Sequence, residues 1–245
     1  WIDVRSNADT LPGLYQGTIC INADDSPELQ IPLLVNVWNF ALPKQNSLPV
    51  VIAHGSPAWF YKKNVEGSDV EQIVKEAEYM LLKHRITPSP IYVAQKAITV
   101  EEVKRWQEAG GKEYNIVYIQ PHPIKAGQAY QGWARQRVLN LLADTVPKLR
   151  EAGVLNDAYI YSFDEIQENS FFAAQGILKE VKELYPDIPL MTTAFDPTFG
   201  EKSGLKDYVD IWVPNERSYR ENRAKIDEIR KEGKKVWYYT CMYRP

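Results

Sequence analysis

From Leu48 onward, short apolar segments alternate with amphipathic segments, and this rhythm constrains the fold more than any other feature of the sequence. Strands are predicted over residues 50–54, 91–94, 115–120, 158–163, 190–195, 211–214 and 236–240. Helices are predicted between them, over residues 69–84, 100–109, 127–151, 170–185 and 219–232. Such alternation is typical of βα units that surround a parallel sheet.

Two architectures contain a parallel sheet of this kind, a (β/α)8 barrel and an open, doubly wound sheet. The open sheet usually carries a glycine-rich phosphate-binding turn after its first strand. The segment after the first predicted parallel strand, residues 54–59 (HGSPAW), has no such turn, and the chain contains neither G-x-G-x-x-G nor G-x-x-x-x-G-K-[ST]. We therefore expect an α/β fold of the (β/α)8, TIM-barrel type. Because seven parallel strands are predicted, we expect the last barrel strand to be missing from this chain.

The first 46 residues have a different pattern. They contain two predicted strands, over residues 15–21 and 31–40, with a polar turn between them. Two strands do not form a stable domain in water. We expect residues 1–46 to be the tail of an N-terminal β-sandwich, and residues 47–245 to be a barrel domain that is truncated at its C-terminus.

Composition narrows the class of ligand. The net charge of -3 gives no basic surplus, which argues against a nucleic-acid partner. The chain has 7 Trp, 15 Tyr and 7 Phe, and such an excess of aromatic rings fits a protein that stacks sugars, although rings also fill cores. We expect no metal or other cofactor, because no His, Cys and Asp cluster has metal-ligand spacing, and no membrane span.

The strongest candidate site is the adjacent pair Asp164 and Glu165, which ends the predicted strand over residues 158–163. Active sites of parallel barrels lie at the carboxyl ends of the strands. Two acids that follow a buried strand lose hydration, which raises the pKa of at least one of them and costs free energy, so we expect such a pair to have a function. A helix is predicted soon afterwards, so a single acid there could instead cap that helix or interact with its dipole. For two acids in succession we favour a catalytic role.

Two neighbouring carboxyls suit a particular reaction. Most retaining glycosidases place their two carboxyls about 5–5.5 Å apart on either side of the anomeric carbon. Successive residues of one strand approach a substrate from a single side. They fit a sugar whose own 2-acetamido oxygen is the nucleophile, because one carboxyl can protonate the glycosidic oxygen while the other holds the amide N–H on the neighbouring carbon.

Five further residues are candidates for substrate binding. They are Trp59, His122, Asn215, Tyr238 and Tyr239. One of the two tyrosines should point into the barrel mouth, because side chains alternate along a strand. Each residue also has a structural alternative: rim or core packing for the aromatic residues, a turn for Asn215, and a rigid loop for His122.

The chain resembles glycoside hydrolase family 123, the β-N-acetylgalactosaminidases. The resemblance rests on residues 11–17 (LPGLYQG), 37–43 (VWNFALP), 84–88 (HRITP), 161–165 (YSFDE) and 236–239 (VWYY). It implies a β-sandwich followed by a barrel, retaining substrate-assisted hydrolysis through an oxazolinium ion, and no metal. It further implies that Glu165 is the general acid/base and that Asp164 orients the acetamido group. The implied partner is a glycolipid or oligosaccharide with a terminal N-acetylhexosamine, and the implied location is secreted or in a bacterial cell envelope.

Other readings remain open. The chitinase-like pattern D-x-D-x-E does not fit, because Tyr161 and Phe163 occupy its acidic positions. The β-hexosaminidase family also ends its fourth strand in Asp-Glu followed by an aliphatic residue, as Ile166 is here. The alternatives are therefore a β-N-acetylglucosaminidase, or a glycan-binding module without turnover on an incomplete barrel.

Overall fold

The structure is a computed structural model that describes residues 2–45, 47–54, 69–93, 96–120 and 126–241. The chain divides into two compact units, Trp1–Lys44 and Gln45–Pro245, and each is described by itself. In the described ranges, no helix is long and apolar enough to cross a membrane.

The smaller unit is an antiparallel hairpin of β1 (Gly13–Ile21) and β2 (Leu29–Val37). The register pairs Tyr15 with Val35 and Ile19 with Ile31. Since side chains alternate along each strand, these four residues share one face of the hairpin, and that face is apolar. The predicted strand pair is thus confirmed.

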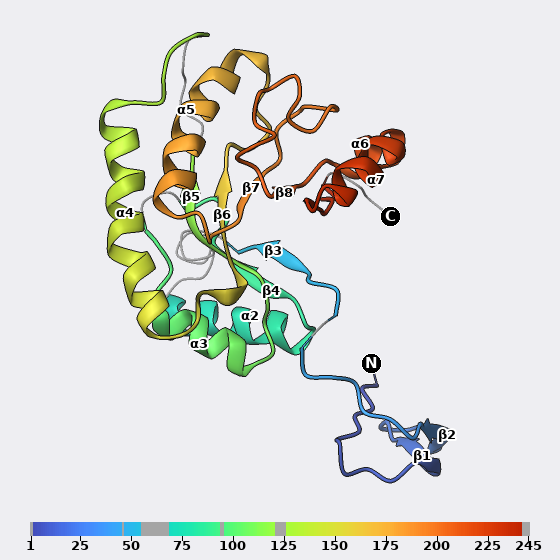
Figure 1. Cartoon of the computed structure of the whole chain (residues 1–245). Coiled ribbons are helices and arrows are strands. Elements are labelled where there is room, and N and C mark those ends of the chain that lie inside the picture. The colour runs from blue at the N-terminus through green and yellow to red at the C-terminus, as the bar shows by residue number, and fades with distance from the viewer. Residues whose placement is uncertain (1, 46, 55–68, 94–95, 121–125, 242–245) are drawn as a thin grey trace. The chain divides into compact units, whose positions relative to one another are not determined.

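The larger unit contains seven strands in the described ranges, in two parallel sheets (Figure 1). The first sheet pairs β3 (Val51–Ala53) with β4 (Thr87–Ser89). The second follows the order of the chain and consists of β5 (Tyr114–Ile119), β6 (Ala158–Ser162), β7 (Leu190–Thr192), β8 (Ile211–Trp212) and β9 (Lys235–Val236). The expected α/β class with a parallel sheet is confirmed, and within the described ranges the strands do not close a barrel.

Helices follow the strands as the sequence pattern predicts. They are α2 (Val70–Lys83), α3 (Val100–Glu108), α4 (Gly132–Glu151), α5 (Glu168–Leu184), α6 (Glu216–Glu221) and α7 (Arg223–Lys231), with a 3-10 turn at Leu155–Asp157. Thr99 and Glu102 form a complete capping box at the start of α3. Helices α4 and α5 run side by side along the sheet (Figure 1), and Arg135 Nε donates to Glu180 between them at 2.8 Å.

The two faces of the five-stranded sheet carry different cores. On the helix-covered face, Ile160 of β6 belongs to the same buried hydrophobic cluster as Leu142 of α4 and Ile177 of α5. The opposite face is rich in tyrosine. Its buried members are Tyr118, Tyr159, Tyr161, Met191, Ile211 and Val213. Because side chains alternate, β6 sends its two tyrosines to this second face, where the sheet ends in Asp164 and Glu165.

One predicted strand is wrong. Residues 91–94 were expected to pair, but the strand lies earlier, at Thr87–Ser89, and includes Pro88. Thr87 N donates to Val50 O and His54 N donates to Ser89 O, both at 2.9 Å. The first and third residues of β4 therefore make its hydrogen bonds to the β3 segment. Pro88 therefore faces β5, where its missing N–H removes a ladder bond. The Ser89 hydroxyl accepts from Asn115 N at 3.1 Å instead, which explains why the sheet is interrupted there.

Two helix predictions also need correction. The helix expected over residues 127–151 begins only at Gly132, whose φ is +66°. The helix expected over residues 219–232 is two helices, α6 and α7, which meet at Asn222. The Asn222 amide donates to Ser218 O at 2.8 Å, and this side-chain bond ends α6 in place of a continued helix.

Candidate functional site

Asp164 and Glu165 lie in the turn between β6 and α5, at the carboxyl end of the sheet. Helix α5 begins at Glu168, and its N-cap residue is Gln167, whose side chain makes no capping hydrogen bond. Neither acid is therefore the N-cap of this helix. The capping alternative raised by the sequence is wrong.

The backbone of this turn is strained. Phe163 and Glu165 have φ values of +51° and +48°, a region that side chains with a Cβ rarely occupy. Each such residue costs about 1–3 kcal/mol and persists only where the surroundings impose it. Here Phe163 N donates to Ile119 O at 3.0 Å, and Thr192 Oγ1 donates to Phe163 O at 3.1 Å. The Phe163 ring is fully buried, and its packing helps to hold the turn in place.

Asp164 is half-buried and is held by one of its two carboxylate oxygens. Oδ1 accepts hydrogen bonds from Tyr161 Oη at 2.5 Å and from Thr193 Oγ1 at 3.0 Å. Burial, and then the bond to Asp164, raises the pKa of the Tyr161 phenol, so this hydroxyl stays protonated and donates. Within the described ranges Oδ2 has no hydrogen bond, which leaves it available to a ligand.

Glu165 has the same asymmetry. Its side chain is exposed, and Oε1 accepts a hydrogen bond from the Tyr239 hydroxyl. Burial, and then Glu165 itself, raises the pKa of the Tyr239 phenol, so Tyr239 is a donor at neutral pH. No hydrogen bond reaches Oε2 from the described part of the chain. Each carboxylate thus has one anchored oxygen and one open oxygen, so the pair can accept an N–H and exchange a proton with a ligand.

Asn215 lies beside Tyr239 at the ends of β8 and β9. The two residues form a parallel bridge, and Tyr239 N donates to Pro214 O at 3.1 Å. Asn215 Oδ1 caps α6 by accepting from Ser218 N at 2.8 Å, which is the turn role the sequence left open. The Asn215 side chain also lowers the pKa of the Tyr239 phenol, against the larger effects of burial and Glu165. Asn215 therefore joins the cluster through Tyr239.

Of the remaining predicted binding residues, only Tyr238 lies in the described ranges, and it is not part of this cluster. Tyr238 is 55% exposed, and its ring lies 5.1 Å from that of Tyr219 on α6, on the opposite side from its neighbour Tyr239. Of the two tyrosines, Tyr239 is therefore the one that turns toward the carboxylates. Trp59 and His122 lie outside the described residues.

Sequence reasoning missed four aromatic or hydroxyl neighbours of the pair. Tyr118 stacks on Tyr161 with ring centroids 5.2 Å apart. Tyr92 stands edge-on to both rings, at 5.8 and 6.1 Å, and is 54% exposed. Thr193 follows β7. Alternation along β5 and β6 could have indicated Tyr118 and Tyr161, whereas no sequence signal identifies Tyr92 or Thr193.

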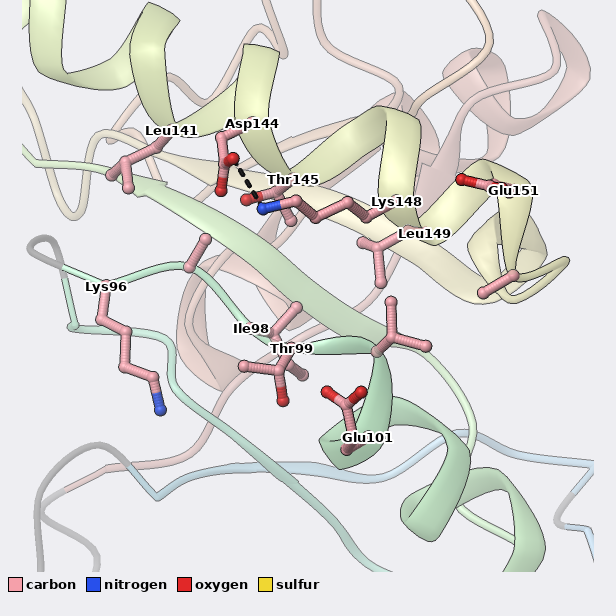
Figure 2. Close-up of a pocket in the computed structure, with 13 residues that line it drawn as sticks. Lys96, Ile98, Thr99, Glu101, Leu141, Asp144, Thr145, Lys148, Leu149 and Glu151 are labelled. Atoms are coloured by element: carbon pink, nitrogen blue, oxygen red, sulfur yellow. Dashed lines mark hydrogen bonds and ion pairs between the residues drawn. The ribbon is translucent and has the colours of Figure 1, made fainter.

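A separate hollow of about 650 Å³ lies between the start of α3 and the second half of α4 (Figure 2). Its lining mixes charges of both signs, and Asp144 pairs with Lys148 at 2.6 Å across one turn of α4. No residue of the Asp164 cluster lines this hollow. No group of His, Cys, Asp and Glu in the described ranges has the arrangement of a metal site.

Comparison with protein-family profiles gives no match, and none is found among curated proteins. Similar solved structures include the following two. A family 123 glycoside hydrolase from Clostridium perfringens, described for glycolipid glycan hydrolysis, has a TM-score of 0.58 and 15% identity, over 95% of this chain and 50% of that chain. A β-D-glucuronidase from Dictyoglomus thermophilum has a TM-score of 0.41 and 12% identity, over 82% of this chain and 36% of that chain. At 15% identity the first likeness concerns the fold, and this chain spans half of that enzyme's length.

Proposed function

We propose that this protein is a glycoside hydrolase that releases terminal β-linked N-acetylgalactosamine by a retaining, substrate-assisted mechanism. The observation that carries the proposal is the arrangement of Asp164 and Glu165: adjacent carboxylates at the carboxyl end of a parallel sheet, each with one oxygen anchored by a tyrosine and one open. The resemblance of the sequence to family 123 and the fold of the family 123 neighbour support it.

The proposed reaction uses the two open oxygens differently. Glu165 donates a proton to the glycosidic oxygen while the 2-acetamido oxygen attacks the anomeric carbon and the aglycone leaves. Asp164 accepts a hydrogen bond from the acetamido N–H and stabilises the positive charge of the oxazolinium ion. Glu165 then removes a proton from a water molecule. The oxygen of this water attacks the anomeric carbon and opens the oxazolinium ring, which restores the 2-acetamido group. Two displacements at the same carbon retain the β configuration.

We also propose that the larger unit is part of a (β/α)8 barrel and that the hairpin belongs to a β-sandwich. For the barrel, the supporting feature is curvature of the sheet. Strands β6 and β9 are separated by β7 and β8, about 14 Å in a flat sheet. Nevertheless the Tyr159 ring of β6 lies 5.8 Å from the Trp237 ring that follows β9. Such a contact requires a concave face, as in the wall of a barrel.

The test is the release of nitrophenol from aryl β-N-acetylgalactosaminide and β-N-acetylglucosaminide by the wild type and by Glu165→Gln. Removing a general acid costs about 10²–10⁴-fold in turnover. Glu168→Gln is a matched control, because this exposed acid lies three residues away and pairs with Lys202 outside the cluster. We expect E165Q to lose turnover and E168Q to retain it.

Each outcome has a distinct meaning. Full activity of E165Q would remove Glu165 from the role of acid. Preference for the gluco substrate would convert the proposal to a β-N-acetylglucosaminidase. A folded protein that turns over neither substrate but binds an immobilised N-acetylhexosamine glycan would be a binding module, and the proposal of hydrolysis would be wrong.

A further inference from the structure

Thr193 is a residue that contacts both Asp164 and Glu165. It follows β7 directly and is only 7% exposed. Its hydroxyl donates to Asp164 Oδ1 at 3.0 Å and accepts from the backbone N–H of Glu165, also at 3.0 Å. A single buried hydroxyl on the neighbouring strand therefore contacts the side chain of one acid and the main chain of the other.

The contact to Asp164 determines which oxygen faces a ligand. Thr193 and Tyr161 both donate to Oδ1, and hydrogen bonds to a charged acceptor are the stronger kind. Rotation of the carboxylate would break both bonds, so Oδ1 stays on the protein side and Oδ2 on the open side. In the proposed reaction Oδ2 is the oxygen that receives the acetamido N–H.

The contact to Glu165 fixes the backbone position from which the Glu165 side chain extends. Glu165 has a φ of +48°, a strained conformation that its surroundings must stabilise. The bond from Glu165 N to Thr193 is one source of that stabilisation. The far end of the side chain is held by Tyr239. Without the Thr193 hydroxyl, the backbone of Glu165 would lose this partner and the direction of the side chain would change.

We propose that Thr193 is a positioning residue that sets Asp164 and Glu165 together, so that N–H polarisation and proton donation act on adjacent positions of one sugar ring. This inference rests on the proposed function. In that reaction the two carboxylates act in the same step, and a misplacement of about 1 Å costs about 10²-fold. A single side chain that bonds the Asp164 carboxylate and the Glu165 backbone fixes where the two side chains start relative to each other.

Kinetics of three variants test the proposal. Thr193→Val removes the hydroxyl and keeps the shape, Thr193→Ser keeps the hydroxyl, and Thr145→Val replaces an equally buried threonine of α4 away from the cluster. We expect T193V to lower kcat about 10²-fold with a smaller change in KM. T193S should recover to within about tenfold of the wild type, and T145V should retain its kcat. Equal losses in T193S and T193V, or an unchanged kcat in T193V, would overturn the proposal.

Crystal structures of the same variants give a readout that does not depend on turnover. In T193V we expect Asp164 to leave its present rotamer or Glu165 to leave its positive φ, whereas T193S should keep both. An unchanged turn in T193V would contradict the positioning role. If the wild type hydrolyses neither aryl glycoside, the proposed function fails and the crystal structures alone decide the role of Thr193.

Tyr161→Phe guards against a T193V protein that does not fold. It removes the other donor to Asp164 Oδ1, together with the hydrogen bond between the Tyr161 and Thr193 hydroxyls at 3.0 Å, but leaves the bond from Glu165 N to Thr193. We expect Y161F to lower kcat, because Asp164 loses one of two anchors, and to keep the backbone of Glu165 in place. A structure of Y161F in which Thr193 keeps its bond to Glu165 N while Glu165 changes its φ would show that Thr193 does not hold it, and the proposal would be wrong.

Discussion

The hydroxyl of Tyr239 donates a hydrogen bond to Oε1 of Glu165, a residue 74 positions earlier in the sequence. The donor follows β9 and the acceptor follows β6, with β7 and β8 between these strands in the sheet. Their side chains can meet only because the sheet curves, so the curvature brings the last described strand to the candidate acid. The fold thus determines the position of Tyr239, and Tyr239 is part of the candidate site.

Tyr239→Phe should therefore impair turnover without unfolding the protein. The variant keeps the ring and removes the donor to Glu165 Oε1. A hydrogen bond to a charged group contributes about 1.5–3 kcal/mol, which corresponds to a loss of roughly 10- to 100-fold in kcat. Steady-state kinetics on the aryl glycoside measures it.

Tyr238→Phe is the matched control for this prediction. Tyr238 is the adjacent residue, and its ring lies against Tyr219 instead of the carboxylates. It should retain the kcat of the wild type. Equal losses in Y238F and Y239F would show that the effect comes from the strand end and not from the bond to Glu165.

Tyr92 should contribute to binding rather than to chemistry. Its ring is half-exposed and stands edge-on to Tyr118 and Tyr161, next to the carboxylates. A sugar at the open oxygens would contact this ring, so Tyr92→Ala should raise KM about tenfold and Tyr92→Phe should leave it nearly unchanged. Tyr79→Ala removes an exposed tyrosine of α2 and serves as control. A KM in Y92A equal to that of Y79A would contradict this role.

Asp196 should prove structural, although it too follows a strand of the sheet. Only 4% exposed, its carboxylate accepts from Thr198 N and Gly200 N at 2.8 and 3.0 Å, and from Ser203 N at 3.0 Å. Burial raises the pKa of Asp196, but the bonds from Ser203 and Thr198 outweigh burial and lower it. The carboxylate thus closes the loop over residues 196–203.

Asp196→Ala should lower the free energy of unfolding by about 3 kcal/mol or more, because several buried donors lose their acceptor. Urea denaturation at neutral pH measures this change, and Glu201→Ala, an exposed acid in the same loop, is the control. In the wild type, the contribution of Asp196 is present above about pH 4 and is lost as the pH falls through its lowered pKa. A stability of D196A equal to that of the control would contradict the structural role.

The sequence predicts the elements of the sheet better than it predicts how they meet. Period-two alternation places Tyr161 on one face of β6 and leaves Asp164 and Glu165 at its end, because these are local properties of one strand. The partnership of Thr193 with both acids depends on the register between β6 and β7. The positive φ of Glu165 depends on tertiary bonds that outweigh local preference. The strand β4 was predicted too late in the chain; it contains Pro88, and a proline usually argues against a strand unless its nitrogen faces a gap in the ladder.

The tyrosine-rich face of the sheet predicts how stability depends on alkaline pH. Burial raises the pKa of the phenols of Tyr118, Tyr159 and Tyr161 above the ordinary value of about 10. These groups stay protonated in the folded protein while the unfolded chain ionises. Their contribution is therefore fully present below about pH 10 and is lost as the pH rises toward the folded values. In that window, each of these tyrosines lowers the free energy of unfolding by at most about 1.4 kcal/mol per pH unit.

Urea denaturation at pH 8, 9, 10 and 10.5 should show this loss as a decline in the free energy of unfolding that steepens near pH 10. Tyr159→Phe should reduce the slope, because it keeps the buried ring and removes one titrating group. Tyr79→Phe, in an exposed position on α2, should leave the slope unchanged. Equal slopes in the wild type and Y159F would mean that Tyr159 does not resist ionisation in the folded state, and the steepening would then have to come from other groups, such as lysine side chains that titrate in the same range.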